Sequence, residues 1–596
     1  MWLDVAVSAP AHSQVGGLLT YCTDLPAQVG QLVRVPFGKR EVLGVVWRVH
    51  SQAPSHVAQS AVKHVTAVLD GVSPLSPHWL QLVQFTAQYY QRAIGEVALA
   101  ALPPQLRDLT PVQLARRLTK HSASEDSLKS ALASPWPLSA QQAQVLAQMA
   151  EAAGPFLIHG ATGSGKTEVY LQAVARCLAE DPEAQALMMV PEINLTPQLE
   201  ARVKARFGAA GVVSMHSGMT GPQRLKSWLA AHQGSARIVL GTRMAIFASM
   251  PKLKWIVVDE EHDASYKQQE GARYSARDLA IYRARLEGAK VILGSATPSL
   301  ESWHQSRPGF TERVPRACPA CGNADIAPMG RGTEQLEEHL TELLTDVKRP
   351  DGQAVRVMRI DADSTKLKGA LEAQLSNVHS GEVDVLVGTQ MIAKGHDFRR
   401  ITLVAAINPD SALFSSDFRA PERLFALLMQ AGGRAGRDAA QSASSEMWVQ
   451  TFHPAHPLFE ALKQHDYPAF AEQQLKERFA AGLPPSSFQA LVRCDARMQA
   501  VAQAFLNHGH AQLQHMAQED AALAAMLAQV SVFSAVPMSI QRVANVERAQ
   551  MLLESTSRAS LHKVLDLLQT CLHASRTDPA HKGLIRWLVD VDPLAI

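Results

Sequence analysis

The chain has 596 residues, of which 47% are hydrophobic and 19% charged, and its formal net charge is +2. These values are ordinary for a folded globular protein, and they exclude a disordered tail, a collagen and a disulfide scaffold. No apolar run approaches the about 20 residues of a membrane span, and no basic segment followed by an apolar run opens the chain, so we expect no membrane segment and no secretory signal.

The first hundred residues predict a small β-rich domain. Strand-like pieces lie at residues 4–9, 31–38 and 42–49, and turn residues such as Gly30 separate them. A helix-like stretch from about 79 to 92 follows. Residues 103–136 are polar and broken by prolines, which predicts a linker with short helices at most.

Two later blocks alternate apolar strand-like runs with helix-like periods. Such alternation predicts βαβ units and a parallel sheet in each block. The length, at roughly 150 residues per domain, fits about four domains. We therefore expect an α/β multidomain protein with a β-rich N-terminal domain, two parallel-sheet lobes and a mixed α+β C-terminal domain. The predicted boundaries are 1–102, linker 103–136, lobe 137–305, irregular segment 306–332, lobe 333–455 and C-terminal domain 456–596.

A P-loop pattern opens the first lobe. It comprises Gly160, Ala161, Thr162, Gly163, Ser164, Gly165, Lys166 and Thr167. A strand-like run precedes it and a helix-like run follows, which is the context its chemistry requires. Backbone N–H groups would hold phosphate, Lys166 would reach the β/γ oxygens and the Thr167 hydroxyl would bind Mg²⁺. The alternative is a chance Gly-rich loop.

A run of acidic residues ends another strand of the same lobe. It reads Asp259-Glu260-Glu261-His262 and follows the apolar residues 255–258. Asp259 lies where the Mg²⁺-coordinating acid of a P-loop NTPase is found, and Glu260 is placed to polarise the attacking water. His262 would link the nucleotide site to a neighbouring strand or to DNA. By itself such a run is more often a solvated turn.

Two arginines, Arg434 and Arg437, end a helix-like run of the second block. The rigid guanidinium fork suits phosphate oxygens. A P-loop in one block and an arginine pair in the other suggest ATP held between two lobes, with the arginines completing the site on closure. The alternative is a surface helix with ordinary cations.

Several loops after strands are typical of a track for a nucleic-acid backbone. Small and hydroxyl residues there let backbone N–H groups approach phosphates closely. These candidates are Thr242, Arg243, Thr389 and Gln390, whereas Thr297, in the loop after residues 291–293, is well placed to couple the lobes. Residues 266–277, which include Tyr266 and Arg273, interleave aromatic and cationic side chains, as surfaces that stack bases and hold phosphates do. The near-neutral net charge does not argue against this, since acidic faces can offset a basic channel.

Together these strings resemble the superfamily-2 DNA helicases, and within them the family of primosomal replication-restart helicases. The resemblance covers both lobes, the N-terminal domain and the C-terminus. The strings that carry it lie at residues 35–38, 160–171, 190–198, 241–247, 259–280, 293–302, 330–340, 387–398, 417–423, 433–437 and 587–593.

The resemblance implies two RecA-like lobes that use ATP and Mg²⁺, with Thr167 and Asp259 as the Mg²⁺ ligands. It implies that Gln142 reads adenine, and that Glu260 is the catalytic acid/base. Arg434 and Arg437 would be the arginines of the last helicase motif, although Gly432 stands where alanine is expected. The implied DNA and coupling contacts are His262, Thr242, Arg243, Tyr266, Arg273, Thr297, Thr389, Gln390 and Lys394.

The resemblance also implies partners and a place of action. The N-terminal domain would bind the nascent 3′ end at an arrested fork. Forked and single-stranded DNA, single-stranded DNA-binding protein, other primosome proteins and the machinery that loads the replicative helicase would be the partners. We expect the protein at forks in the bacterial cytoplasm.

Zinc is one point where the chain departs from the family. The family carries an insertion with eight cysteines, whereas here only Cys318 and Cys321 lie close together. Structural zinc needs four ligands, so these two supply half. Cys494 and Cys571 lack ligand-pair spacing, and the sequence does not show that His304 helps. A residual or intermolecular zinc site stays open.

The chain is also shorter than the family in two places. A strand and an NRRG-like motif are missing before the cysteines, and residues 103–136 are shorter than the winged-helix domain expected there. A shortened linker, a degenerate enzyme and an error in the gene model would each account for this.

The leading hypothesis is an ATP-dependent 3′→5′ DNA helicase that recognises arrested forks and initiates primosome assembly. The rival is a fork-binding loading platform that hydrolyses ATP with little or no unwinding. A third reading is a translocase without fork preference.

Overall fold

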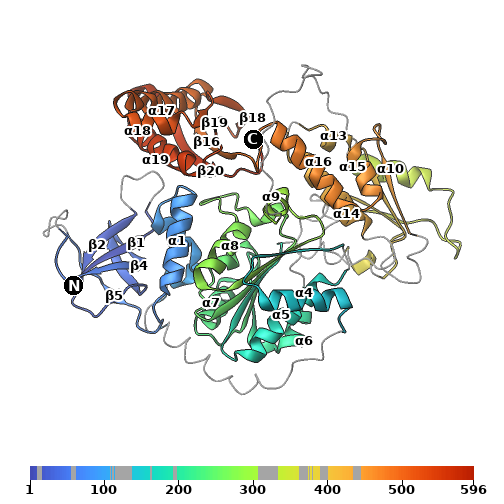
Figure 1. Ribbon diagram of the computed structural model, residues 1–596, viewed down its shortest axis with the longest axis horizontal. Helices are drawn as coiled ribbons and strands as arrows, with labels where there is room; N and C mark the ends of the chain where they lie inside the picture. The colour runs from blue at the N-terminus through green and yellow to red at the C-terminus, as the bar shows by residue number, and fades with distance from the viewer. Residues whose placement is uncertain are drawn as a thin grey trace.

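The computed structural model describes residues 1–9, 17–54, 62–107, 109, 113, 137–161, 164–191, 197–306, 333–360, 374, 376–378, 380–389, 401–415, 417–433 and 445–596. Some predicted site residues lie outside this set: Thr162, Gly163, Cys318, Cys321, Gln390, Lys394, Arg434 and Arg437. Figure 1 shows an N-terminal β domain, a central lobe, a second lobe and a C-terminal domain. The predicted fold class is confirmed.

The N-terminal domain is an antiparallel sheet in the order β2-β1-β4-β3-β5. Its strands are β1 (Trp2–Val7), β2 (Leu18–Cys22), β3 (Leu32–Phe37), β4 (Arg40–His50) and β5 (Ala67–Val68). Both faces of β1 and the middle of β4 are buried. Inside the sheet, Arg34 donates from Nη2 to the carbonyls of Leu106 (3.0 Å) and Leu109 (2.7 Å), which ties the chain after 102 back to this domain.

Two helices join this sheet to the central lobe. They are α1 (Pro77–Tyr89) and α2 (Ile94–Ala101), followed by the 3-10 turn η2 (Pro104–Arg107). Ser76 caps α1 by accepting from the N–H of Trp79. The Trp79 indole N–H in turn donates to the carbonyl of Phe247 in the central lobe at 2.9 Å. The N-terminal domain is therefore packed directly against the central lobe.

Lobe 1, residues 137–295, contains a six-stranded parallel sheet in the order β6-β11-β10-β7-β9-β8. The strands are β6 (Phe156–His159), β7 (Gln185–Met189), β8 (Val212–Met215), β9 (Ile238–Gly241), β10 (Leu253–Asp259) and β11 (Lys290–Ser295). Alternate residues of each inner strand pack into two different cores. Apolar side chains on both faces explain why these strands read as continuous apolar runs.

Helices cover both faces of this sheet, as Figure 1 shows. The helices α4 (Ala140–Glu151), α5 (Lys166–Glu180) and α6 (Pro197–Phe207) share one core with it. The helices α7 (Gly221–His232) and α8 (Ala276–Glu287) share the other, which continues into α1 and α2. Short 3-10 turns complete the lobe: η5 (Ala209–Gly211), η6 (Arg243–Phe247) and η7 (Ala264–Tyr266).

The described part of lobe 2 contains two parallel strand pairs. They are β12 (Val357–Ile360) with β13 (Val385–Gly388), and β14 (Leu403–Ile407) with β15 (Glu446–Gln450). The helices are α9 (Leu300–Gln305), α10 (Thr333–Leu343), α13 (Asp410–Leu413), α14 (Ala420–Gly432), α15 (Pro457–Lys463) and α16 (Tyr467–Ala480). The predicted gap before the cysteines falls on residues 307–332, outside the described residues.

Helices on both sides of the predicted boundaries of lobe 2 share its core. Leu300 of α9 packs in one cluster with Phe425 of α14 and Phe470 of α16. The sequence assigned residues up to 305 to lobe 1 and residues from 456 to the C-terminal domain, and these boundaries stay predictions. Periodicity alone could not reveal this packing, since a helix of either domain has the same apolar pattern.

The C-terminal domain begins at β16 (Phe488–Ala496). Its sheet has the order β17-β19-β16-β20, with β18 also paired to β19. The other strands are β17 (Val530–Val532), β18 (Val536–Val543), β19 (Val546–Ser555) and β20 (Leu584–Val591). The helices are α17 (Gln499–Glu519), α18 (Ala521–Leu527) and α19 (Arg558–Ser575), followed by η9 (Pro579–His581).

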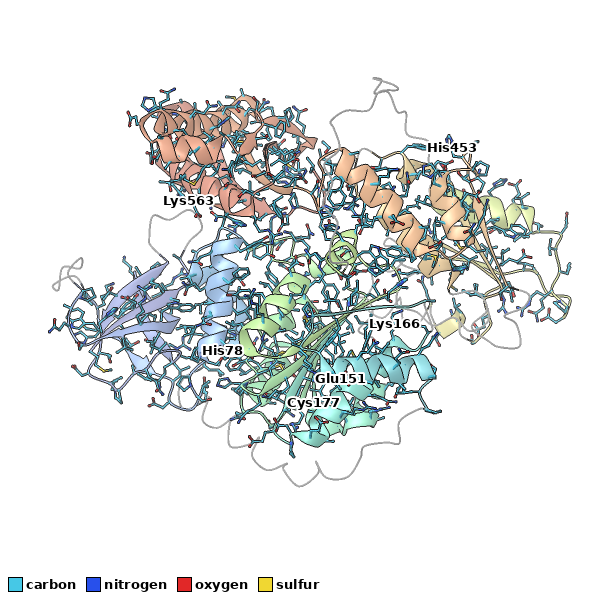
Figure 2. The ribbon with its side chains drawn as sticks, in the orientation of Figure 1. His78, Glu151, Lys166, Cys177, His453 and Lys563 are labelled. Atoms are coloured by element: carbon cyan, nitrogen blue, oxygen red, sulfur yellow. The ribbon has the colours of Figure 1, made fainter. Side chains whose placement is uncertain are left out.

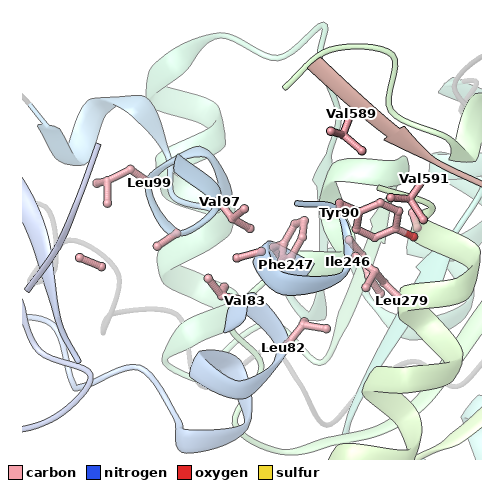
Figure 3. Packing of buried hydrophobic residues seen from close by; sticks show 14 of the residues in the cluster. Leu82, Val83, Tyr90, Val97, Leu99, Ile246, Phe247, Leu279, Val589 and Val591 are labelled. Carbon is pink, nitrogen blue, oxygen red and sulfur yellow. The ribbon is translucent and has the colours of Figure 1, made fainter. Parts of the chain in front are cut away.

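One apolar cluster connects three of the four parts. Figure 3 shows Tyr90, Leu279 and Val591 packed together, from the N-terminal helices, from lobe 1 and from β20. The C-terminal strand is therefore in contact with lobe 1. Among the described residues, no helix has both the length and the apolar character that a membrane crossing requires.

Candidate nucleotide site and its link to the second lobe

The P-loop lies between β6 and α5, as its pattern predicts. Gly165 adopts a left-handed conformation (φ 82°) directly before the first residue of α5, which is Lys166. Lys166 donates from Nζ to the carbonyls of Gly160 (2.7 Å) and Ala161 (3.2 Å). The free N–H groups at the start of α5, with Thr167 as its second residue, form an anion-binding terminus. Figure 2 labels Lys166 on the side of lobe 1 that faces lobe 2.

Gln142 is in contact with the P-loop. Its side chain closes a capping box with Ser139 at the start of α4, and its Nε2 donates to the carbonyl of Ser164 at 2.8 Å. A Cβ atom on Gly165 would lie 2.4 Å from that Nε2. Glycine at this position is favoured by its φ, and a Cβ there would displace the side chain of Gln142 from the P-loop.

The acidic run meets the P-loop at one edge of the sheet. In the parallel register, Ser295 is opposite His159 and Asp259 is opposite Gly294, so the strand ends come together. Burial, and then the charge of Glu260, raise the pKa of Asp259 to about 7, against the opposing effect of Lys166. A carboxylate and a threonine hydroxyl are oxygen donors of the kind that Mg²⁺ prefers.

Glu260 adopts a left-handed backbone conformation, with φ 47°. Such a φ is uncommon for a side chain of this size. Its Oε2 is buried and accepts no hydrogen bond from any residue that the structure describes. Nδ1 of His262 lies 3.6 Å from this oxygen. The carboxylate is thus free to accept a hydrogen bond from a ligand.

His262 connects three elements. Its Nδ1 is 2.7 Å from Oγ of Ser295 at the end of β11. Its Nε2 is 3.2 Å from Nε2 of Gln430 in α14. The imidazole therefore connects the acidic run to the end of β11 and to α14, the helix of lobe 2 that precedes residues 434–437. The predicted link to a neighbouring strand is present in the structure.

Gly294 shows how tightly this edge is packed. A Cβ atom on Gly294 would lie 1.6 Å from the hydroxyl of Tyr170 on α5. Burial, followed by the charges of Asp259 and Glu260, raises the pKa of Tyr170 well above its usual value. The phenol therefore stays neutral next to the acidic run, and only glycine fits opposite it.

Glu261, to which the sequence assigned no role, fixes the segment after β11. It is 1% exposed and accepts hydrogen bonds from the N–H of Ser299 (2.6 Å), its hydroxyl (3.1 Å) and the hydroxyl of Ser302 (3.0 Å). Arg277 balances its charge at 3.4 Å. Thr297 lies in the segment held this way and is buried. The acidic run thus positions the start of α9, and it also lies at the edge of the sheet that carries the P-loop.

A partly buried ionic cluster, in which Arg478 is fully buried, then holds α9 against lobe 2. Glu301 of α9 pairs with Arg419 and lies 3.6 Å from Arg478. Arg478 pairs with Glu422 at 2.6 Å, and Glu422 accepts the N–H of Leu300 at 3.1 Å. Burial favours the neutral form of Glu301, but Arg419 and Arg478 outweigh it and lower its pKa to about 2. We call Glu301, Arg419, Glu422 and Arg478 the α9 cluster.

Thr242 and Arg243 line a cavity of about 360 Å³ between α2 and lobe 1. Thr242 is buried. Arg243 donates to the side chain of Gln268 (2.6 Å) and to the carbonyl of Ser265 (3.1 Å). Tyr274 and Glu270 line the same cavity. Thr389 is exposed after β13, in the other lobe.

One predicted DNA contact, Tyr266, is corrected, and the contact predicted for Arg273 stays a prediction. Tyr266 is 2% exposed, and its hydroxyl donates to the carbonyls of Met189 (3.0 Å) and Asp259 (2.6 Å). It supports the acidic run and cannot stack on a base. Arg273 pairs with Asp590 of the C-terminal domain at 3.1 Å. The aromatic and cationic residues of this segment led to a wrong prediction for Tyr266, because the sequence shows residue types but not which side chains are buried.

Asp590 is the centre of a buried ion-pair cluster at the end of β20. Lys267 lies 3.3 Å away, Arg273 3.1 Å and Arg493 3.5 Å. Lys267 and Asp590 are both buried. Two positions on, Asp592 accepts a hydrogen bond from Tyr89 of α1 at 2.6 Å. The C-terminal strand thus connects to the loop after the acidic run and to the N-terminal helices.

Asp590→Asn is expected to destabilise the protein by roughly 3–5 kcal/mol, because it leaves the buried Lys267 charge uncompensated. We also expect weaker stimulation of ATP hydrolysis by DNA, since the loop at 267–273 loses its anchor. Thermal unfolding and ATPase assays measure both. Asp495→Asn removes a carboxylate paired with exposed Arg586 in the same sheet and should change little. Equal effects of the two substitutions would contradict this role.

Sequence reasoning passed over the residues that connect domains. Glu301, Arg419 and Glu422 lie within strings that carry the family resemblance, at 293–302 and 417–423, and Asp590 lies within 587–593. Their position within these strings is the one sequence feature that could have indicated a functional role. A charge on a predicted helix usually faces solvent, and the sequence does not show that these charges face one another across a domain boundary.

Models of known protein families match four parts of the chain. The 3′DNA-binding domain (3′BD) matches residues 4–103 and the DEAD/DEAH box helicase matches 139–305. The helicase conserved C-terminal domain matches 330–439 and the primosomal protein N C-terminal domain matches 480–594.

Curated relatives match over much of the chain. The replication restart protein PriA of Haemophilus influenzae is 31% identical, over 96% of each chain. PriA of Bacillus subtilis is 34% identical over 56% of this chain and 52% of its own length. The Haemophilus alignment extends over 735 positions, more than the 596 residues here, so the relative has segments that this chain lacks. The solved structure of RecG bound to three-way DNA junction has a TM-score of 0.34 at 18% identity, over 67% of this chain and 53% of that one.

Proposed function

This chain belongs to the PriA family of replication restart proteins, and from that premise we propose that it is an ATP-dependent 3′→5′ DNA helicase. It would recognise arrested forks and initiate primosome assembly. The observation that supports this most directly is the position of His262. It contacts Ser295 beside the nucleotide edge and Gln430 of lobe 2, which is the connection that a two-lobe motor needs.

The nucleotide chemistry would follow from the residues at the sheet edge. Lys166 and the first N–H groups of α5 would hold the β- and γ-phosphates. Thr167 and Asp259 would hold Mg²⁺, which supplies charge neutralisation between the phosphates when bound. Glu260, whose Oε2 is free of hydrogen bonds from described residues, would accept a proton from the attacking water.

Closure of the lobes would complete the site. We propose that Arg434 and Arg437, just beyond the described end of α14, contact the γ-phosphate in the closed state. Gln142, already bound to the P-loop, would read the adenine. Loss of the γ-phosphate would favour reopening, and the α9 cluster would carry the movement between the lobes because α9 follows directly on the segment held by Glu261.

The DNA path would run along lobe 1 beside the N-terminal domain. The cavity between α2 and the loop of Thr242 and Arg243 would hold part of the single strand, with Thr389 contacting it from lobe 2. The N-terminal sheet would bind the 3′ end at the fork. Single-stranded DNA-binding protein, other primosome proteins and the loading machinery of the replicative helicase would be partners. The zinc prediction for Cys318 and Cys321 stays a prediction.

Strand displacement on a forked DNA, with ATP hydrolysis followed in the same tube, tests this proposal. We expect unwinding that depends on ATP and hydrolysis that depends on DNA. Hydrolysis without unwinding would favour the loading platform, the rival suggested by the segments that this chain lacks relative to the Haemophilus protein. Absence of both activities with intact fork binding would contradict the motor.

Comparison of forks with and without a nascent 3′ end tests the recognition step. We expect tighter binding when the 3′ end is present, because one whole domain matches a 3′ DNA-binding module. Equal affinity for the two forks would favour a translocase without fork preference. The comparison is made without nucleotide, so that the binding preference is measured apart from the motor.

A further inference from the structure

Two histidines and an aspartate of the C-terminal domain lie close together, far from the nucleotide edge. His508, Asp578 and His581 each offer one ligand atom, and these atoms lie within 4.8 Å of one another. They come from two elements. His508 lies on α17, while Asp578 and His581 begin and end the short turn η9 that leads into β20.

The hydrogen bonds around the three side chains leave their ligand atoms available. His581 has its Nδ1 3.0 Å from the carbonyl of Ser575. A carbonyl can only accept, so Nδ1 carries the proton and the lone pair is on Nε2. Asp578 uses Oδ1 to accept the N–H of Ala580 at 2.8 Å, and its Oδ2 is directed toward Nδ1 of His508, 4.0 Å away.

His508 is held through Gln512. Its Nε2 lies 3.2 Å from Nε2 of Gln512, and Oε1 of Gln512 accepts from the hydroxyl of Ser575 at 3.0 Å. The orientation of a glutamine amide is assigned from its hydrogen bonds, and metal binding at Nδ1 of His508 would turn this amide over, so that Nε2–H of His508 donates to its oxygen. The Ser575 hydroxyl still donates to the carbonyl of Cys571 at 2.9 Å. Hydrogen bonds of this kind orient histidines that bind metals.

The site is open on one side. His581 is buried, whereas the side chains of His508 and Asp578 are 36% and 37% exposed. A cavity of about 340 Å³ lies against Asp578 and His581, with Arg576 and Lys582 among its other lining residues. An ion can therefore enter, and a fourth coordination position would face this cavity and hold water.

We propose that His508, Asp578 and His581 bind a divalent transition-metal ion of the zinc class. Imidazole nitrogens favour such ions, whereas Mg²⁺ and Ca²⁺ prefer all-oxygen sets. A tetrahedral ion with bonds of about 2.0–2.1 Å holds its ligands about 3.3 Å apart, so the side chains would close inward by about 1 Å. The bound ion would clamp α17 to the turn before β20, the strand that supplies Asp590 to the loop at 267–273.

Cobalt titration of the metal-stripped full-length chain tests the proposal, with Co²⁺ alone as the probe. We expect one equivalent to give the visible bands of a nitrogen–oxygen site, without the near-ultraviolet charge-transfer band of a thiolate ligand. His508→Gln and Asp578→Asn should each weaken binding by about 100-fold or more, since each removes a ligand. The Asp578→Asn side chain keeps an oxygen for the N–H of Ala580, which protects the turn.

Two control variants make the result specific. His515→Gln changes an exposed histidine two turns further along α17 and should leave cobalt binding unchanged. A Cys318→Ser, Cys321→Ser chain should also retain the nitrogen–oxygen bands. The proposal is overturned if wild-type protein gives no such bands, if they disappear with the cysteines, or if His508→Gln and His515→Gln bind cobalt equally. DNA binding by each variant verifies that it is folded.

Discussion

Lys166→Ala is expected to lower the rate of DNA-stimulated ATP hydrolysis by at least about 10²–10³-fold, the loss typical when one charge-stabilising donor is removed from an active site. The amine lies at the mouth of the P-loop, where it donates to Gly160 and Ala161. Unwinding should be lost together with ATP hydrolysis. Fork binding should remain, because the substitution does not change the N-terminal domain. A coupled ATPase assay and a fork-binding titration measure the two effects.

Lys252→Ala is the matched control for this experiment. Lys252 is exposed, pairs with Glu183 and lies at the opposite end of the sheet, before β10. Its loss should leave hydrolysis within the error of the assay. Hydrolysis that persists in Lys166→Ala, at a rate like that of the control, would remove the P-loop from the mechanism.

Glu301→Gln is expected to separate ATP hydrolysis from unwinding. The substitution keeps the shape of the side chain but removes the carboxylate shared by the partly exposed Arg419 and the buried Arg478, which keeps Glu422 as a partner. Breaking a buried ion pair costs roughly 3–5 kcal/mol, so α9 should no longer be held firmly against lobe 2. We expect hydrolysis to persist and unwinding to fall by about tenfold or more. The ratio of strands displaced to ATP hydrolysed is the measurement.

The pH dependence of the α9 cluster gives a second readout. The pKa of Glu301 is lowered from 4.5 to about 2, so its stabilisation is complete above about pH 4.5 and is lost as the pH falls through 2. Wild type and Glu301→Gln should therefore differ in stability at pH 7 and converge in acid. Glu460→Gln, which removes an exposed carboxylate paired with Lys463 in lobe 2, is the control. A constant difference at all pH values would contradict the ionic role.

The parts of the site that the sequence predicts are those formed within short sequence patterns. The P-loop, the acidic run and their strands are local patterns, and parallel strands bring their carboxyl ends to one edge. These features and the overall fold class could be predicted without coordinates.

Contacts between distant segments could not be predicted in this way. Lys267 and Asp590 lie more than 300 residues apart, and neither has a periodicity that indicates a buried charge. Tyr266 has the composition of a stacking surface, yet it is buried because its hydroxyl finds two carbonyl acceptors. Whether such a side chain is buried depends on its position in the fold and not on its residue type.

The ion pairs of Asp590 also impose an order on the assembly of the molecule. Ribosomal synthesis completes both lobes before β20 emerges. Until then the loop at 267–273 has no carboxylate for its buried lysine, and an ammonium without a partner is kept in water. The loop at 267–273 and the strand β20 are therefore expected to become ordered together, because the buried lysine of one needs the carboxylate of the other.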